Sequence, residues 1–258
     1  MSPRERLFTA ASWALGLAAC AADVHAGPLS LEAAHTVEQL SAARTNWRST
    51  EFLASWRDPA GWAANGTLRR TERFALIDSQ VEAGAAIGLA PQWRSEAELS
   101  ISESHRVLPV WRWRGRVWRD GIAGWNFALG AGRTLYRSAI TQGSAVTELQ
   151  AERYVPDWRF AWASSATRLD GAGISTAHVA RADWYAHERL TFGATLGRGR
   201  EVENTPNTGL VSSSVRSAAL KAQWALTPAW WLGAELSSQR QGDRYERNGL
   251  RLGLRFQH

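Results

Sequence analysis

The chain has 258 residues and a formal net charge of +6, carried almost wholly by arginine because Lys221 is the only lysine. The basic residues are mixed with acidic ones from end to end, whereas proteins that bind nucleic acid gather them on one face or segment, so no nucleic-acid partner is expected. Cys20 is the only cysteine, which excludes an intramolecular disulfide and a thiolate metal cluster. No metal or phosphate-loop motif occurs, and we expect no cofactor.

The N-terminal residues predict a secretory signal peptide over residues 1–26. Two arginines precede an uncharged apolar stretch, and Val24 and Ala26 fit the small-residue positions of a cleavage site. Cys20 follows three residues typical of a lipoprotein cleavage site, so lipoprotein processing remains an alternative. Residues 27–258 contain no linker or low-complexity segment and are expected to form one domain.

From Leu29 onward, the chain alternates apolar with polar or small residues, which is the period of a β-strand. In chain order, the clearest segments are 81–89, 93–101, 111–117, 125–131, 148–152, 158–162, 180–186, 220–226, 230–239 and 250–256. Between the predicted connections, each alternating stretch runs for about ten residues, the length that a tilted strand needs to cross a bilayer. We therefore predict an all-β fold, a closed antiparallel up-and-down transmembrane β-barrel, with about 14 strands and 12 as the alternative.

The predicted connections are short at one end of the strands and longer at the other, as in outer-membrane barrels. The longer links are predicted at residues 40–46, 103–109, 137–143, 169–174, 200–213 and 241–244. Tryptophans beside the short turns predict one interfacial girdle: Trp56, Trp62, Trp93, Trp118, Trp125, Trp158, Trp184 and Trp230. Aromatic residues near the longer links predict a second: Trp47, Phe74, Trp111, Tyr136 and Tyr245.

The polar face of the predicted strands carries charges of both signs, which we expect to line the lumen. These candidates are Arg94, Arg112, Arg114, Arg116, Glu148, Glu152, Arg159, Arg181, Asp183, Glu235, Arg251 and Arg255. One interpretation is a salt-bridge network that fills a narrow barrel, because charges removed from water need partners. The other is a path for an anionic solute or a glycan along the three arginines of segment 111–117.

Residues in the predicted loops are candidates for binding a sugar or a cation outside the cell: His105, Arg106, Asp170, Glu201, Gln241 and Asp243. Turn chemistry and loop packing are the alternative explanation. No hydrolase motif is present, so no enzymatic activity is expected; His105 or His178 would be the candidates if there were one. The last segment predicts a barrel-assembly signal formed by Gly249, Leu252, Leu254 and Phe256, although Gln257 and His258 follow it.

Five short motifs resemble those of the YaiO family of outer-membrane β-barrels. They are His105–Pro109, Thr167–Gly171, Gly199–Glu201, Gln239–Asp243 and Arg251–Arg255, and the resemblance runs from about Leu29 to the end. It implies a location in the outer membrane of a Gram-negative bacterium. Similar barrels follow helical repeats in exopolysaccharide exporters, which implies a role connected with glycans. This chain has no such repeat before its barrel, so a separate partner would have to supply one.

Together these features predict a non-enzymatic barrel of the bacterial envelope that assists export, passage or surface presentation of polysaccharide. A narrow barrel with a structural or surface-recognition role is one alternative, and a secreted soluble carbohydrate-binding β-protein is another. The expected partners are outer-membrane lipid, the barrel-assembly machinery and glycan or exopolysaccharide export partners.

Overall fold

The computed structural model describes residues 29–258 except 42–45, 74, 106–107, 138–140, 172 and 206–208. Of residues 201–205 and 209–212 it describes the backbone only. The signal-peptide prediction for residues 1–26, with its alternative at Cys20, lies outside the described residues. In the described ranges, no helix is long and apolar enough to cross a membrane.

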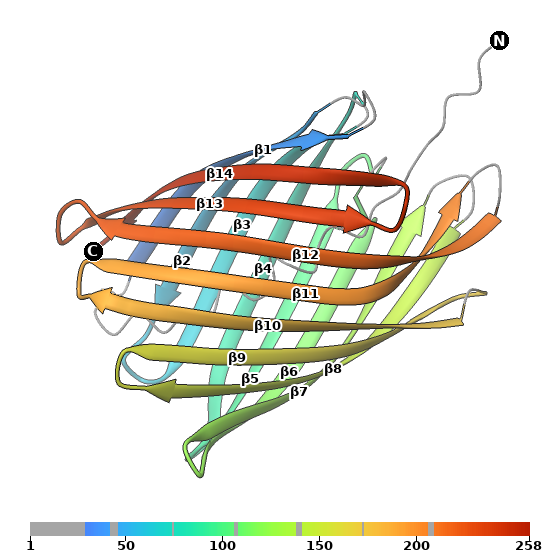
Figure 1. Ribbon diagram of the computed structural model, residues 1–258. Helices are drawn as coiled ribbons and strands as arrows, with labels where there is room; N and C mark the ends of the chain where they lie inside the picture. The colour runs from blue at the N-terminus through green and yellow to red at the C-terminus, as the bar shows by residue number, and fades with distance from the viewer. Residues whose placement is uncertain are drawn as a thin grey trace.

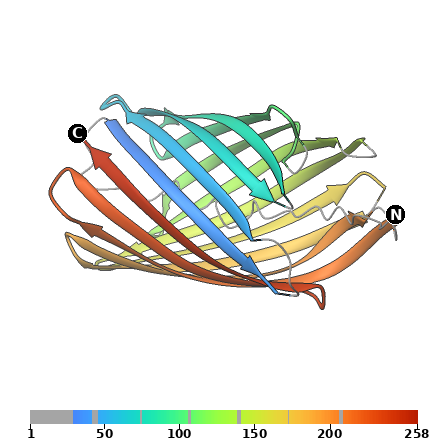
Figure 2. The same ribbon diagram turned by 90° about the horizontal axis from the view of Figure 1, so that it is seen from above.

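The described part of the chain forms fourteen strands that close into one antiparallel barrel, in which each strand pairs with its neighbours in sequence (Figures 1 and 2). The strands are β1 (Leu29–Leu40), β2 (Trp47–Arg57), β3 (Trp62–Arg73), β4 (Leu76–Ala90), β5 (Trp93–Ser102), β6 (Trp111–Ile122), β7 (Trp125–Arg137), β8 (Thr141–Val155), β9 (Trp158–Leu169), β10 (Gly173–His187), β11 (Leu190–Thr205), β12 (Gly209–Ala225), β13 (Trp230–Gln241) and β14 (Tyr245–Gln257). The predicted fold class is confirmed, with fourteen strands rather than twelve.

The barrel closes where the first strand pairs with the last. β1 and β14 are antiparallel neighbours from the pair Ser30 and Gln257 to the pair Leu40 and Arg247. Closure leaves no open sheet edge, so the backbone donors and acceptors of every strand face a neighbour. This satisfies the requirement that a lipid environment imposes, because an unpaired backbone group in hydrocarbon costs several kcal/mol.

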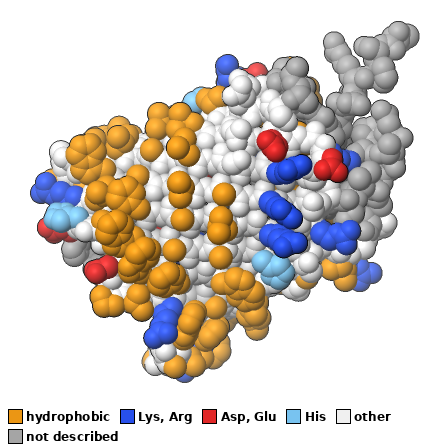
Figure 3. Space-filling model, viewed as in Figure 1, with side chains coloured by type: hydrophobic (Ala, Val, Ile, Leu, Met, Phe, Trp, Pro, Cys, Tyr) orange, Lys and Arg blue, Asp and Glu red, His pale blue; other side chains and the backbone are white. Residues whose placement is uncertain are grey.

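Alternate residues of each strand face outward and form a broad apolar surface. Leu129 is 69% exposed, and Leu196, Leu220 and Leu236 are each more than 60% exposed. Figure 3 shows apolar side chains gathered into a belt across the face of the barrel that is in view. A soluble monomer does not expose an apolar surface of this extent, so the alternative of a secreted soluble β-protein is wrong.

The two ends of the barrel carry different connections. One end has turns of two to four residues, for example at residues 91–92 and 188–189, while the other has the two longest links, 41–46 and 103–110, together with connections of two or three residues, so the links predicted to be long at 137–143, 169–174 and 241–244 are short. Short turns are typical of the periplasmic end and longer loops of the extracellular end. The predicted long link 200–213 is wrong, because β11 and β12 continue through most of it as a paired ribbon.

The predicted periplasmic girdle is largely present. Trp62, Trp93, Trp158, Trp184 and Trp230 each have 40–43% of their surface exposed, and the rings of Trp158 and Trp184 stack with centroids 6.0 Å apart. Their amphipathic indole rings therefore lie at the level expected for a membrane interface.

Three of the predicted girdle residues point into the barrel instead. Trp118 follows the outward-facing Val117, so the two-residue period turns it inward, where it is 2% exposed. Trp47 and Tyr245 are likewise buried, at 1% and 4% exposure. Phe74 lies outside the described residues. The second, extracellular aromatic girdle is therefore not formed as predicted.

The residues of the predicted assembly signal lie on β14. Leu252 and Leu254 face outward, and the Phe256 ring packs against Trp230 with centroids 5.1 Å apart. Gly249 faces inward, where an added Cβ would lie 2.5 Å from the Ser237 hydroxyl. The last strand thus has an apolar outer face and a glycine where its inner face meets β13.

Candidate functional site

The twelve predicted lumen residues all lie on the inward face of their strands, opposite the exposed apolar side chains. The structure brings eight of them into ion pairs: Arg94, Arg112, Arg116, Glu152, Arg159, Arg181, Asp183 and Arg251. The other four lie on the same inner wall. Glu148 accepts a hydrogen bond from Gln150, and the guanidinium of Arg255 lies 5.3 Å from the centre of the Trp231 ring.

The remaining two predicted residues are placed by strand register. Arg114 on β6 lies opposite Glu98 on β5. Glu235 on β13 lies between two cations, since its partners are Lys221 on β12 and Arg251 on β14. Charges of opposite sign therefore alternate across these strands as well.

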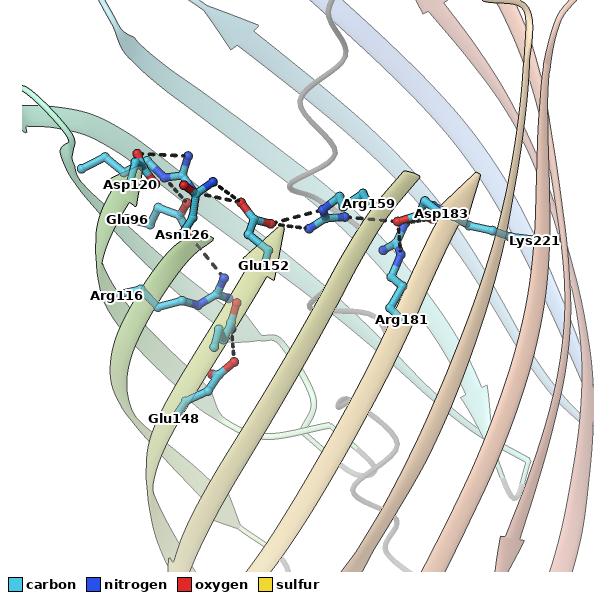
Figure 4. Close-up of polar contacts among 12 residues, drawn as sticks. Glu96, Arg116, Asp120, Asn126, Glu148, Glu152, Arg159, Arg181, Asp183 and Lys221 are labelled. Atoms are coloured by element: carbon cyan, nitrogen blue, oxygen red, sulfur yellow. Dashed lines mark hydrogen bonds and ion pairs between the residues drawn. The ribbon is translucent and has the colours of Figure 1, made fainter. Parts of the chain in front are cut away.

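A chain of ion pairs runs along the inner wall from β5 to β10 (Figure 4). A guanidinium nitrogen of Arg94 lies 3.8 Å from the Asp120 carboxylate, and another lies 3.7 Å from Glu152. Arg159 then donates to Glu152 at 2.9 Å and to Asp183 at 3.3 Å. Arg159, Glu152 and Asp183 are almost completely buried, so these interactions are poorly screened by solvent.

Asp183 is the most heavily paired carboxylate of this chain of ion pairs. Its oxygens lie 2.7 Å from Arg181 Nε, 3.3 Å from Arg159 Nη1 and 3.3 Å from Lys221 Nζ. Gly193 on the neighbouring strand makes room for this cluster, because a Cβ there would lie 2.6 Å from both Asp183 Oδ1 and Lys221 Cε. The glycine is thus part of the arrangement that allows one carboxylate to bind three cations.

A second cluster lies on β4, β5 and β6. Arg112 Nη2 lies 2.7 Å from Glu82 and 2.8 Å from Glu98, and it donates a hydrogen bond to each carboxylate. One guanidinium thereby bridges two carboxylates that would otherwise repel each other.

A third cluster crosses the seam where the barrel closes. Arg251 on β14 lies 2.8 Å from Glu32 on β1 and 3.6 Å from Glu51 on β2. Glu51 also accepts a hydrogen bond of 2.6 Å from Arg69 on β3. Ion pairs therefore reinforce the pairing of the first and last strands. The sequence had not predicted Glu51 and Arg69 as site residues, because the alternation of β2 and β3 is less marked.

Inward-facing arginines also cover aromatic rings. The Trp47 ring has Arg73 at 4.7 Å and Arg247 at 5.1 Å from its centre, and Arg94 lies 4.4 Å from the centre of Trp118. A desolvated cation–π contact of this kind stabilises by about 2 kcal/mol or more. This explains how aromatic side chains are accommodated in a charged lumen.

The segment between β5 and β6 is held at the extracellular mouth by a buried carboxylate. Asp78 on β4 accepts hydrogen bonds of 2.8 Å from the Leu108 backbone N–H and 2.8 Å from the Ser104 hydroxyl. Asp78 is 0% exposed, and Leu108 is also buried. The segment therefore packs against the inward face of β4.

Neutral polar groups lie next to Asp78 on the inward faces of β4 and β5. Gln80 donates from its amide nitrogen to Ser100 at 3.4 Å and to Ser102 at 3.3 Å. These residues were not predicted as a site. The signal that could have found them is the alternation of Asp78, Gln80 and Glu82 along β4.

The predicted loop-binding residues do not converge on one site. His105 lies in the link between β5 and β6, and Asp170 accepts a hydrogen bond from the backbone N–H of Gly143 on β8. Gln241 is not in a loop: it ends β13, is 0% exposed and hydrogen-bonds Ser213 inside the barrel. Asp243 is fully exposed in the last turn.

Two further predicted residues are only partly covered by the structure. Arg106 lies outside the described residues. Glu201 lies in β11, but its side chain is among those that are not described.

The two histidines considered for catalysis lie apart. His178 faces outward on β10 and stacks on Trp162, whereas His105 is in the mouth segment and contacts the Ser102 carbonyl. In the described part of the chain, no group of three or more potential ligands could hold a metal ion.

Solved membrane barrels share this architecture at low sequence identity. A monoaromatic hydrocarbon channel, CymD, has a TM-score of 0.63 and 9% identity, covering 98% of this chain and 94% of that chain. A bacterial polysaccharide outer membrane secretin has a TM-score of 0.56 and 12% identity, covering 91% and 99%. A loop-deletion mutant of OmpT, an outer membrane protein of Vibrio cholerae, has a TM-score of 0.53 and 9% identity, covering 88% and 97%.

No curated protein matches the sequence. The model of the YaiO membrane beta barrel domain matches residues 29–204, which is most of the described barrel. The family match, the closed fold and the lipid-facing belt agree on one location. This chain is an outer-membrane β-barrel that belongs to the YaiO family.

Proposed function

We propose that the barrel is a non-enzymatic channel through which a polar, sugar-rich solute passes, and that it assists the export, passage or surface presentation of polysaccharide. The observation that carries the proposal is the course of the lumen ion pairs. They run along the wall between nearby strands and leave the axis of the barrel free of the bridges described above.

The strand positions of the ion pairs support this argument. Arg69 and Glu51 lie on adjacent strands, Lys221 and Asp183 lie two strands apart, and the widest of the pairs described above, Arg94 with Glu152, spans three. Opposite walls are seven strands apart. For 14 strands spaced about 4.8 Å apart and tilted by about 40°, the backbone diameter is roughly 25–30 Å. Two extended arginine side chains do not span that distance.

The chemistry of the wall suits a carbohydrate. Paired charges of both signs produce a polar surface without a strong preference for small ions of one sign. Amide and hydroxyl side chains such as Gln80, Ser100 and Gln150 are buried among these charges, so the wall itself is built from polar groups. One structural relative is a polysaccharide secretin, and the shared architecture makes the same class of cargo a reasonable first choice here.

Planar-bilayer recording of the purified full chain tests the channel directly. We expect discrete conductance steps with weak ion selectivity, and a concentration-dependent reduction of the current when a neutral oligosaccharide is added to one side. The absence of current at every voltage would overturn the proposal. Current that is insensitive to oligosaccharides would remove the carbohydrate part of it.

A matched pair of variants separates lumen effects from surface effects. Arg112→Gln removes a lumen cation between Glu82 and Glu98, and we expect it to shift the selectivity toward cations. Arg48→Gln removes an exposed arginine from the outer face of β2 and should leave the selectivity unchanged. Equal behaviour of the two variants would contradict a current that passes through the lumen.

A second candidate function is a barrel whose mouth is closed and that serves a structural or recognition role. The contacts of Asp78 with Leu108 and Ser104 favour it, since they hold a segment against the inner wall at the extracellular end. Bilayer recording distinguishes the two: a closed mouth predicts no current in the parent protein and current once the segment is released by Asp78→Ala.

A further inference from the structure

The outer face of β11, β12 and β13 changes abruptly at the extracellular edge of the apolar belt. Among the described side chains, Leu196, Leu220 and Leu236 are the last large apolar ones that face outward on these strands, and they are among the most exposed of the barrel. Beyond them the outward positions hold the basic residues Arg198, Arg200, Arg216 and Arg240, which we call the arginine patch. Figure 3 shows basic side chains grouped beside the belt over these strands.

The strand register places arginines of the patch directly opposite one another. Arg198 on β11 is the partner of Arg216 on β12, and Arg216 is the partner of Arg240 on β13. Neighbouring strands are about 4.8 Å apart, and like charges directly opposite each other destabilise a sheet. The barrel therefore holds three cations in a row at an energetic cost that a bound anion would remove.

Among the described side chains, carboxylates lie beside one end of this row. Arg240 lies 3.9 Å from both Asp243 and Glu246. In the part of the chain whose side chains are described, Arg198, Arg200 and Arg216 form no ion pair. The arginines inside the barrel differ in this respect, because each cluster in the lumen includes carboxylates. Among the described side chains, Arg198, Arg200 and Arg216 therefore have no carboxylate partner, whereas Arg240 at the end of the row has two.

The depth of the patch identifies the environment of its ligand. Arg198 follows Leu196 by two positions, while Arg216 and Arg240 are four positions from Leu220 and Leu236. At about 3.3 Å per residue and a tilt of about 40°, the arginines lie roughly 5–10 Å beyond the edge of the belt. This is the level of lipid headgroups. Because the patch faces outward, it meets lipid rather than solute in the lumen.

We propose that the arginine patch is a binding site for a phosphorylated lipid of the outer leaflet, namely the phosphate groups of lipopolysaccharide. Guanidinium groups bind phosphate oxygens in a bidentate manner, and neighbouring guanidiniums on adjacent strands match a headgroup with more than one phosphate. The site replaces an aromatic girdle on this side of the barrel. It is independent of what passes through the lumen.

The test compares two charge-matched variants in detergent. R198Q/R200Q/R216Q removes three arginines of the patch. R48Q/R70Q/R133Q removes three outward arginines that have no arginine as their strand partner. Binding is measured by native mass spectrometry with bisphosphorylated lipid A, the same lipid without phosphates, and inorganic phosphate.

We expect the parent and the R48Q/R70Q/R133Q control to bind bisphosphorylated lipid A with similar affinity. The patch variant should bind it roughly 100-fold more weakly, from the loss of three arginines near an anionic headgroup. Dephosphorylated lipid should bind weakly to all three proteins. Unchanged binding by the patch variant, or an equal loss in the control, would overturn the proposal, as would inorganic phosphate that competes at the concentration of the lipid.

A loss of folding can be distinguished from a loss of lipid binding. Removing like charges that face each other should leave the patch variant at least as resistant to heat as the parent in lipid-free detergent. If the triple variant does not fold, the single variant R216Q, which removes the centre of the row, is compared with R133Q in the same assay. Equal lipid affinity of these two would again overturn the proposal.

Discussion

Asp183→Asn keeps the shape of the side chain but removes the negative charge that three cations share. At 3.3 Å and an effective dielectric constant of about 20, one such pair is attractive by about 5 kcal/mol. Repulsion among the cations and the cost of burying the carboxylate offset most of the summed attraction. Removing one partner from a buried ionic cluster costs about 3–5 kcal/mol, and the 3% exposure of Asp183 places it in that class.

The assay is the temperature at which the purified barrel loses its compact, heat-modifiable form on a gel. For a protein of this size, 1 kcal/mol corresponds to about 2–4 °C, so Asp183→Asn should lower the midpoint by roughly 10 °C. Asp157→Asn is the matched control, because Asp157 is exposed in a turn and should leave the midpoint unchanged.

A double variant checks the electrostatic origin of the effect. Adding Lys221→Met to Asp183→Asn removes one of the cations left without a counterion and should recover part of the lost stability. The reasoning is refuted if Asp183→Asn melts at the parental temperature, or if the double variant is less stable than the single one.

Three further variants test other parts of the barrel. Phe256→Ala should lower the yield of membrane-assembled protein by removing the ring that packs on Trp230, while His258→Ala should assemble normally; normal assembly of Phe256→Ala would contradict an assembly signal. Asp78→Asn weakens the contacts of the mouth segment and should increase fluctuations of the channel current, and a quiet trace would argue against a loop held at the mouth. Gly193→Val should lower the melting midpoint, because its side chain would displace Lys221 from Asp183; an unchanged midpoint would show that the cluster tolerates the intrusion.

The two-residue period along the chain was sufficient to predict the barrel. It is a local property, and it assigns a face to every residue of a strand without knowledge of the partner strand. The apolar belt, the inward position of Arg112 and Asp183, and the closing strand from Tyr245 follow from it. Trp118 was predicted to belong to the outer girdle because it lies near a turn, although the two-residue period places it inside, and that prediction was wrong.

The lengths of the extracellular connections required the structure. The segment 200–213 has turn-forming residues and was predicted to be a long link, yet β11 and β12 pair through most of it. A pair of strands that extends beyond the membrane does not need a continuous apolar face, so the two-residue period did not indicate that β11 and β12 continue there. The mouth segment is a second case, since only the fold brings Leu108 to Asp78 across 30 residues of sequence.

The sequence by itself determined the class of fold, the direction of each side chain and the polar character of the lumen, because all three depend on alternation within a strand. Which charges meet was decided by the tertiary structure. Arg94 reaches Glu152 three strands away because the wall is curved, and Arg198, Arg216 and Arg240 form a row because the register of three strands aligns them. Curvature and register depend on pairing between distant segments, and no local pattern contains them.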